Sequence, residues 1–246
     1  MCVITRDRWR YYLQGLGNTI SMTAVALCIG VVIGLIIAFV RTTWDKNSEN
    51  MSGYSKIILS ILNFICKVYL TVIRGTPVII QLMIIYYVIF ASSTNGMLIG
   101  ALAFGINSGA YVAEIFRSGI MSIDNGQFEA GRSLGFNYFQ TMRYIIMPQA
   151  IKNVVPTLAN EFIVLLKETS VAGYVAVMDL TKAGDIVRGV TYVQFMPLLI
   201  VASMYLIMVM FFTHLVSKLE KKMANETPIA KQEKAKQWRF LKFMKG

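Results

Sequence analysis

The sequence is poor in charge, histidine and cysteine. Only 15% of its 246 residues are charged and 56% are hydrophobic, whereas about a quarter of the residues of a soluble domain are charged. This composition excludes a water-soluble globular enzyme, a disordered regulator and a disulfide-rich secreted module. The single histidine, His214, and the three cysteines, Cys2, Cys28 and Cys66, follow no metal-ligand spacing, so no metal site is expected. Long apolar runs indicate an integral membrane protein.

Five apolar segments predict an all-α protein with five transmembrane helices, since about 20 apolar residues cross about 30 Å of hydrocarbon. Residues 57–91 are too long for one crossing. Their first half carries polar residues every three or four positions, which fits a helix at the membrane surface or packed against the bundle. Pro77 then breaks that helix, so the second crossing is expected after it; two crossings in this region, six in all, are the alternative. The predicted crossings are 19–40, 77–91, 97–116, 154–172 and 192–216, and the polar stripe is Ser60, Asn63, Lys67, Thr71 and Arg74.

Two local features follow from the same reading. Pro156 is expected in the first turn of the fourth crossing, where its missing N–H is tolerated. Residues 173–189 are expected to form a loop. No cleavable signal peptide is expected, because the first apolar run is too long and no small-residue cleavage site follows it.

The basic residues predict the orientation. With five crossings, 16 of the 24 Lys and Arg residues fall on one side, nine of them after position 217, and five fall on the other side. Because basic residues gather on the cytoplasmic side, the N-terminus is expected outside and the C-terminus inside. Arg6, Arg8 and Arg10 run against this rule.

The transmembrane domain is expected to cover residues 1–217, and residues 218–246 to form a basic cytoplasmic tail. Basic residues mixed with aromatic ones are typical of attraction to anionic membrane lipid; a solvated, disordered tail is the alternative. Nucleic acid is not expected as a partner, because the tail is tethered to the membrane. The residues concerned are Lys231, Lys234, Lys236, Trp238, Arg239, Phe240, Lys242, Phe243 and Lys245.

The predicted cytoplasmic loop, about residues 117–152, contains a spaced motif. We expect a short helix that leaves the membrane, turns sharply at Gly135 and presents a compact surface to another subunit; an ordinary amphipathic connector is the alternative. The motif resembles the EAA loop of bacterial ABC-importer permeases, which implies that it couples to a cytoplasmic ATPase. Its residues are Glu129, Ala130, Gly131, Gly135, Ile145 and Pro148.

Further segments, in order from about Gly15 to Leu219, resemble the polar amino acid permease family (the histidine, glutamine and arginine group). They are Asn18-Thr19, Arg74 to Pro77, Asn107 to Glu114, Asn160 to Phe162 and Lys167 to Ser170. The resemblance implies a type I ABC importer in the bacterial cytoplasmic membrane. It would have two permease subunits (copies or paralogues), two ATPase subunits and an extracytoplasmic amino-acid-binding protein. The chain lacks the Gly-x-x-x-x-Gly-Lys-Ser/Thr phosphate loop, so ATP and Mg are expected on the ATPase, and this chain, with no cofactor of its own, is expected to be no enzyme.

A charged group within a crossing costs free energy unless it has a partner of opposite charge or is solvated by water. Each such group is therefore a candidate functional residue. Glu161 has no Lys or Arg at i±3 or i±4. We expect it to face a cavity, where it could bind the ammonium group or a cationic side chain of an amino acid. A hydrogen-bonded carboxyl that packs the bundle is the alternative.

Asn107, Tyr111 and Glu114 share one face of the third crossing. That face could line the substrate pathway, or it could join helices with the help of Gly105 and Gly109 in a small-xxx-small pattern. Glu114 can also pair with Arg117, which lies three positions later in the same predicted helix.

The break before the second crossing adds further candidates. Freed backbone carbonyls near Thr76 and Pro77 could reach a ligand, as in interrupted transporter helices, and Gln81 is a further pocket candidate. Lys167 and Glu168, near the outer end of the fourth crossing, are expected to snorkel or to form a gate pair rather than to bind substrate.

The leading interpretation is a permease subunit that forms the pathway of an ATP-driven importer for polar amino acids. A self-sufficient secondary transporter or channel is the alternative, but such a protein is expected to show internal repeats and none is visible. A membrane enzyme would need clustered His, Cys or acidic residues, and a single histidine argues against it.

Overall fold

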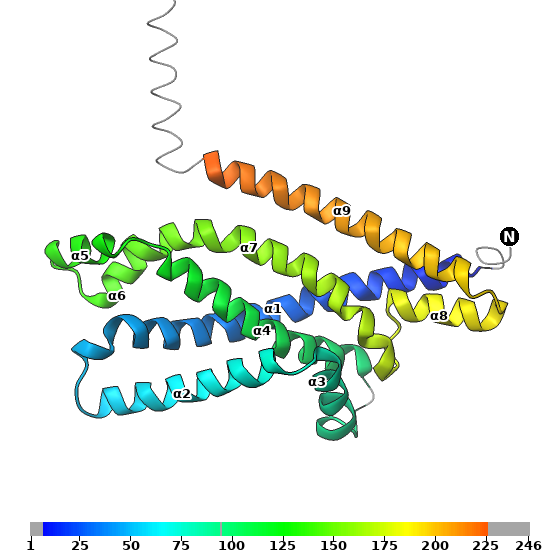
Figure 1. Ribbon diagram of the computed structural model, residues 1–246, viewed down its shortest axis with the longest axis horizontal. Coiled ribbons are helices and arrows are strands. Elements are labelled where there is room, and N and C mark those ends of the chain that lie inside the picture. The colour runs from blue at the N-terminus through cyan, green and yellow to red at the C-terminus, as the bar shows by residue number, and fades with distance from the viewer. Residues whose placement is uncertain (1–6, 94, 226–246) are drawn as a thin grey trace, which may run out of the picture.

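The structure is a computed structural model that describes residues 7–93 and 95–225, and within these ranges it contains helices and no strand. Five long helices run roughly along the long axis of the molecule, and shorter helices lie at its two ends and beside its middle (Figure 1). The long helices are α1 (Trp9–Asn47), α2 (Tyr54–Gly75), α4 (Gly96–Met121), α7 (Met147–Glu168) and α9 (Phe195–Asn225). The shorter elements are η1 (Ser48–Asn50), α3 (Val78–Ile84), η2 (Ile85–Ile89), α5 (Asn125–Ser133), α6 (Tyr138–Thr141), η3 (Met142–Ile146), η4 (Thr169–Val175) and α8 (Leu180–Thr191).

Four helices, α1, α2, α4 and α9, are long and apolar enough to cross a membrane. Helix α7 has 22 residues, about 33 Å, but it carries polar side chains such as Asn160 and Glu161. It packs against α1, α4 and α9, so its polar residues can face other helices. The all-helical membrane fold expected from the sequence is confirmed.

The helix lengths do not support residues 77–91 as a complete second crossing, whereas the expectation that the preceding helix packs against the bundle is confirmed, because α2 contacts α1 and α4. Helix α2 is itself long and apolar enough to span. After Pro77 there are only the seven residues of α3 and the five of the π-helical turn η2, together about 18 Å. Two residues of the polar stripe, Asn63 and Arg74, face α1 and α4 rather than water.

Two smaller predictions are wrong. Most of the expected loop 173–189 is helical, because Asp179 caps α8 by accepting hydrogen bonds from the N–H groups of Thr181 and Lys182. Burial raises the pKa of the Asp179 carboxyl, and these donors oppose the rise. Pro156 lies inside α7 rather than in its first turn, since the helix already begins at Met147.

The chain ends add two observations. Helix α9 runs without a break to Asn225, so the described part of the expected tail, 218–225, continues the last long helix. The basic and aromatic residues 231–245, together with Cys2 and Arg6, lie outside the described residues.

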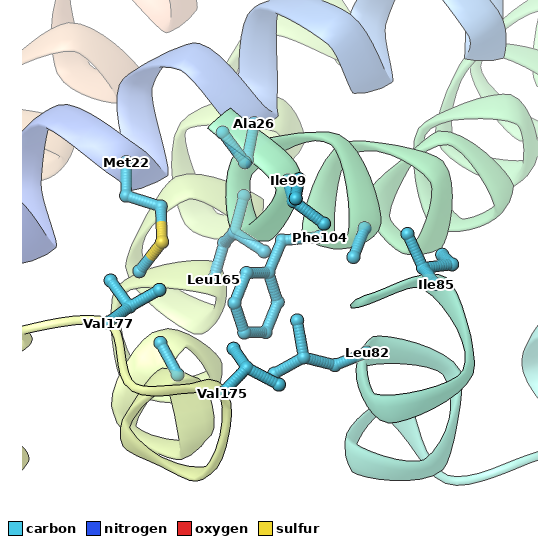
Figure 2. Close-up of a cluster of buried hydrophobic side chains, with 12 residues drawn as sticks. Met22, Ala26, Leu82, Ile85, Ile99, Phe104, Leu165, Val175 and Val177 are labelled. Carbon is cyan, nitrogen blue, oxygen red and sulfur yellow. The ribbon is translucent and has the colours of Figure 1, made fainter. Parts of the chain in front are cut away.

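The core of the bundle lies around α4. Phe104 is fully buried, and Met22, Leu82, Leu165 and Val175 close around it from α1, α3, α7 and η4 (Figure 2). Five segments that are distant in sequence therefore meet at one cluster, with α4 at its centre.

Helices α1 and α4 approach closely because glycines leave room for the opposite side chains. A Cβ atom added at Gly34 would lie 2.5 Å from Val112 Cγ1, and one added at Gly105 would lie 2.8 Å from Ile29 Cβ. Gly109 faces Ile33 in the same way. The small-residue contact expected at Gly105 and Gly109 is thus observed, with α1 as its partner.

This packing predicts that Gly34→Ala destabilises the fold by about 1–3 kcal/mol, because the added methyl group overlaps Val112 and the backbone of α4. Gly17 lies on the same helix with open space around it, so Gly17→Ala gains helix propensity without a clash. Thermal unfolding of the purified protein in detergent measures both variants. A Gly34→Ala variant as stable as Gly17→Ala would contradict the packing.

Candidate functional site

A line of polar side chains crosses the bundle at the break between α2 and α3. Gln81 Nε2 donates to the hydroxyl and the carbonyl oxygen of Thr76, at 2.8 and 3.1 Å. Gln81 Oε1 accepts from Asn107 Nδ2 of α4 at 2.9 Å. On the next residue of α4, Ser108 Oγ donates to Glu161 Oε1 of α7 at 3.0 Å. We call Thr76, Gln81, Asn107, Ser108 and Glu161 the polar belt.

The position of the belt follows from the chain break. Pro77 ends the hydrogen-bond ladder of α2 and leaves backbone carbonyls without helical donors. Gln81 Nε2 supplies donors to two of these, the carbonyls of Ile73 and Thr76, at 2.7 and 3.1 Å. Asn107 is the twelfth of the 26 residues of α4, so the belt lies near the middle of that helix.

Gln81, Asn107, Ser108 and Glu161 of the belt are buried, whereas Thr76 is exposed. Asn107 is 2% exposed, and its Oδ1 atom is buried without a hydrogen-bond partner. Glu161 is 9% exposed, and none of the ion pairs formed by residues 7–93 and 95–225 includes it. The arrangement can accept hydrogen bonds from a positively charged donor, because the belt contains a carboxylate, Glu161, and an amide oxygen without a partner, Asn107 Oδ1.

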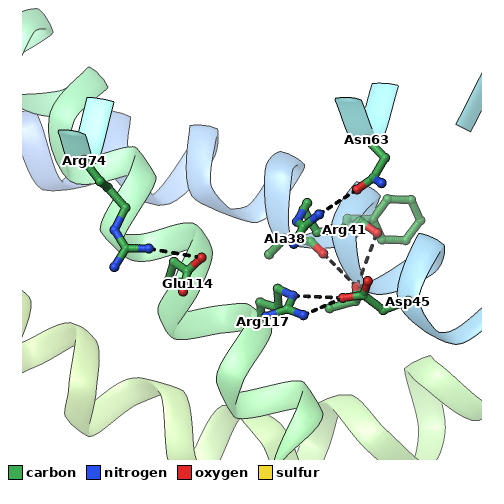
Figure 3. A network of polar contacts seen from close by, with 9 residues as sticks. Ala38, Arg41, Asp45, Asn63, Arg74, Glu114 and Arg117 are labelled. Carbon is green, nitrogen blue, oxygen red and sulfur yellow. Dashed lines mark hydrogen bonds and ion pairs between the residues drawn. The ribbon is translucent and has the colours of Figure 1, made fainter. Parts of the chain in front are cut away.

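The other two residues predicted on this face of α4 lie further along the helix, beside α2. Arg74 Nη1 lies 3.3 Å from Glu114 Oε1, and its guanidinium lies 5.7 Å from the centre of the Tyr111 ring. The predicted pair between Glu114 and Arg117 is not formed. Arg117 instead bonds Asp45 of α1, with Nε and Nη2 at 2.9 and 2.8 Å from Oδ2 (Figure 3). Helix packing brings each charge a partner from a different neighbour.

Lys167 and Glu168 lie at the last turn of α7, away from the belt. Lys167 is exposed and Glu168 is half-buried. Six residues separate Lys167 from Glu161, about 9 Å along the helix. The structure therefore does not bring this pair together with the polar belt.

The expected coupling segment forms a helical hairpin at one end of the bundle (Figure 1). Helix α5 carries Glu129 and Ala130 as exposed residues and Gly131 as a buried one, against Thr141. Gly135 has φ of +80°, so the sharp turn expected there is observed. Asn137 then begins α6 with a capping box.

The two remaining residues of the motif lie on the return path to the bundle. Ile145 is half-buried in the π-helical turn η3, and Pro148 is exposed in the first turn of α7. The motif therefore has both an exposed part and a part that packs within the hairpin.

The end of α1 holds the turn between α4 and α5 from both sides. Asp45 binds Arg117 before the turn, and Lys46 Nζ donates to Asn125 Oδ1 at 2.6 Å after it. Lys46 also lies 5.0 Å from the centre of the Phe128 ring. These contacts join the hairpin directly to the closely packed pair α1 and α4.

Comparison with known proteins decides the family. Residues 30–225 match the family of the binding-protein-dependent transport system inner membrane component. The chain belongs to this family.

Relatives of the permease are named as amino acid transporters. A Rickettsia typhi protein named putative glutamine transport system permease protein GlnP is 37% identical over 216 residues, 87% of this chain and 93% of that protein. The Bacillus subtilis arginine transport system permease protein ArtQ is 31% identical over 216 residues, 87% and 92% of the two chains.

Solved structures agree with this assignment. A crystal structure of an amino acid ABC transporter with histidines has a chain that is 40% identical, with a TM-score of 0.76 over 87% of this permease and 94% of that chain. The MetNI methionine ABC transporter shares the fold, with a TM-score of 0.74 at 19% identity, over 89% and 99% of the two chains.

The permease is therefore the membrane-spanning subunit of an amino acid ABC importer, of the type I fold, and not an enzyme. Such a subunit works with an ATPase and with a binding protein. This membership removes the alternatives of a self-sufficient transporter and of a membrane enzyme.

Sequence reasoning missed several residues of these contacts. Ser108 lies next to Asn107 in the segment Asn107 to Glu114. Its only signal in the sequence was a small hydroxyl residue in the middle of an apolar helix. Asp45, Lys46 and Asn125 carried no signal, because they meet only through the packing of the long helices.

The contact between Asp45 and Arg117 predicts a charge-reversal experiment. Asp45→Arg alone is expected to lower the stability of the permease by roughly 1–3 kcal/mol, because it places two cations together and leaves Arg117 partly buried without its partner. Adding Arg117→Asp is expected to restore most of the loss. Thermal unfolding of the three variants measures the coupling. A double variant less stable than the single one would contradict the pairing.

Proposed function

We propose that the permease forms the pathway for a polar amino acid and that the polar belt holds the ammonium group, or a cationic side chain, as it passes. The supporting observation is Glu161, a buried carboxylate at the middle of the bundle with a hydroxyl partner and no cation. Asn107 Oδ1 offers a second acceptor, on the residue that precedes Ser108, the partner of Glu161. The relatives named for glutamine and arginine transport agree with a substrate of this class.

The remaining pathway candidates are assigned by their place in the structure. Thr76, Pro77 and Gln81 form the break that meets the belt. Tyr111 and Glu114 lie beside Arg74, further along α4. The substrate would pass them on one side of the belt. Lys167 and Glu168 would act at a gate near the end of α7.

We infer five crossings, made by α1, α2 with α3, α4, α7 and α9. Helix α2 would share its crossing with α3, because the break at Pro77 lies beside the middle of α4. The start of α1 and the α5–α6 hairpin lie at opposite ends of the bundle (Figure 1). The excess of basic residues then puts the N-terminus outside and the hairpin and C-terminus in the cytoplasm.

The proposed assembly contains two permease subunits, the second a copy or a paralogue, with two ATPase subunits below them and an extracytoplasmic amino-acid-binding protein above. The ATPase would bind ATP and Mg, and the exposed part of the α5–α6 hairpin, with Glu129 and Ala130 on α5, would be its docking surface. Surrounding lipid completes the partners.

The belt predicts the effect of Glu161→Gln. The variant keeps the shape and the bond from Ser108 but removes an attraction of roughly 4 kcal/mol at 4 Å and an effective dielectric constant of 20. In the reconstituted importer we expect a marked loss of uptake and of substrate-stimulated ATP hydrolysis, larger for arginine than for glutamine. The protein should fold normally. Glu49→Gln, which neutralises an exposed carboxyl outside the proposed pathway, is the matched control, and wild-type uptake by Glu161→Gln would remove Glu161 from the pathway.

The hairpin predicts a second experiment. Gly135→Val is expected to distort the turn, because a β-branched residue strongly disfavours φ of +80°. Uptake and co-purification of the ATPase should fall while the long helices remain folded, as circular dichroism would report. Gly135→Asn is the control, since Asn tolerates the left-handed conformation better. Normal ATPase association and uptake in Gly135→Val would show that the hairpin is not the coupling element.

A further inference from the structure

A polar cavity of about 510 Å³ opens between α1, α2 and α4. Three cationic residues border it, with a single carboxylate, and Figure 3 shows three of these four side chains. The lining residues are Arg41, Lys67, Leu70, Thr71, Arg74, Gly75 and Glu114.

The charges that border this cavity do not balance. Arg74 is paired with Glu114. Arg41 Nη1 donates to the neutral Asn63 Oδ1 at 2.9 Å, and its Nε atom is buried without a partner. In the part of the chain that the structure describes, Lys67 has no ion-pair or hydrogen-bond partner for its ammonium group. Two cations are left uncompensated between long apolar helices, where an unpaired charge is costly.

Arg41 and Lys67, the two cations of this cavity that have no carboxylate partner among the described residues, lie near one edge of the membrane. Arg41 ends the apolar run 19–40 and is followed by Trp44, Asp45 and Lys46, a composition typical of the membrane boundary. Lys67 lies one turn of α2 beyond Asn63, the partner of Arg41, and a lysine side chain can extend several ångströms toward a headgroup. This end of the bundle carries the α5–α6 hairpin (Figure 1).

Large apolar side chains flank Lys67 on α2 and point away from the bundle. Phe64, Val68 and Val72 are 65%, 46% and 54% exposed. Helix α2 buries only Asn63 and Leu70, so it is loosely held by the rest of the chain. A ligand with an anionic head and long apolar tails would satisfy both the cations and these side chains, whereas a small free anion would satisfy only the cations.

We propose that this cavity binds an anionic phospholipid of the inner leaflet. The phosphate would lie between the Arg41 guanidinium and the Lys67 ammonium, and an acyl chain would lie along Phe64, Val68 and Val72. Basic pockets between helices at the cytoplasmic side suit such headgroups. The lipid would fasten α2 to α1, next to the Arg74 pair. The leaflet, but not the binding itself, rests on the orientation given under the proposed function.

Native mass spectrometry of the assembled importer, taken from nanodiscs with equal phosphatidylglycerol and phosphatidylcholine, tests this inference. The wild-type complex is expected to retain phosphatidylglycerol selectively. Lys67→Gln should reduce that retention roughly fivefold, the effect of about one basic residue near a charged membrane surface. Lys56→Gln, an exposed position on the same helix outside the cavity, and Lys67→Arg should both behave like the wild type.

Equal retention of the two lipids by the wild type, as expected if a second permease subunit fills the cavity, would overturn the inference. Equal phosphatidylglycerol retention by Lys67→Gln and the wild type would overturn it too. Both readouts are independent of transport. If selective lipid binding is absent while Glu161→Gln lowers uptake as expected, only the lipid site is rejected. If selective lipid binding is present while Glu161→Gln takes up substrate at the wild-type rate, only the pathway proposal is rejected.

Discussion

The hydrogen bonds that Asn107 and Ser108 make with two different neighbours of α4 hold the middle of the bundle together. One joins α4 to the break between α2 and α3 through Gln81, and the other joins α4 to α7 through Glu161. In a membrane, water does not replace these bonds, so polar groups at this depth must find each other. Asn107 Oδ1 is left without a partner and Glu161 without an ion pair among the described residues, and the proposed function assigns both to a charged substrate.

The glycine contact between α1 and α4 connects this centre to the end of the bundle that carries the α5–α6 hairpin. The two helices pack closely along this contact. The end of α1 binds residues on both sides of the turn into α5 through Asp45 and Lys46. A continuous set of packed and hydrogen-bonded residues therefore runs from the hairpin to the polar belt.

Much of this arrangement could be predicted from the sequence. Apolar runs predicted the helical membrane fold, and Gly135 predicted the turn that its positive φ confirms. The residues of the belt were mostly singled out, because polar groups are conspicuous in apolar segments. Which of them pair was not predicted, since Gln81 with Asn107 and Arg74 with Glu114 meet only through tertiary packing. The place of helix α2 was left open for the same reason: a polar stripe looks alike whether it faces water or another helix.

The central claim is that a substrate's positive group exchanges for the contacts now made within the belt. The most direct measurement is a high-resolution structure of the assembled importer with an amino acid bound within the membrane. The account predicts density for the ammonium group, or for a cationic side chain, within hydrogen-bond distance of the Glu161 carboxylate and near Asn107. An amino acid bound elsewhere, with the bond from Ser108 to Glu161 unchanged, would contradict it.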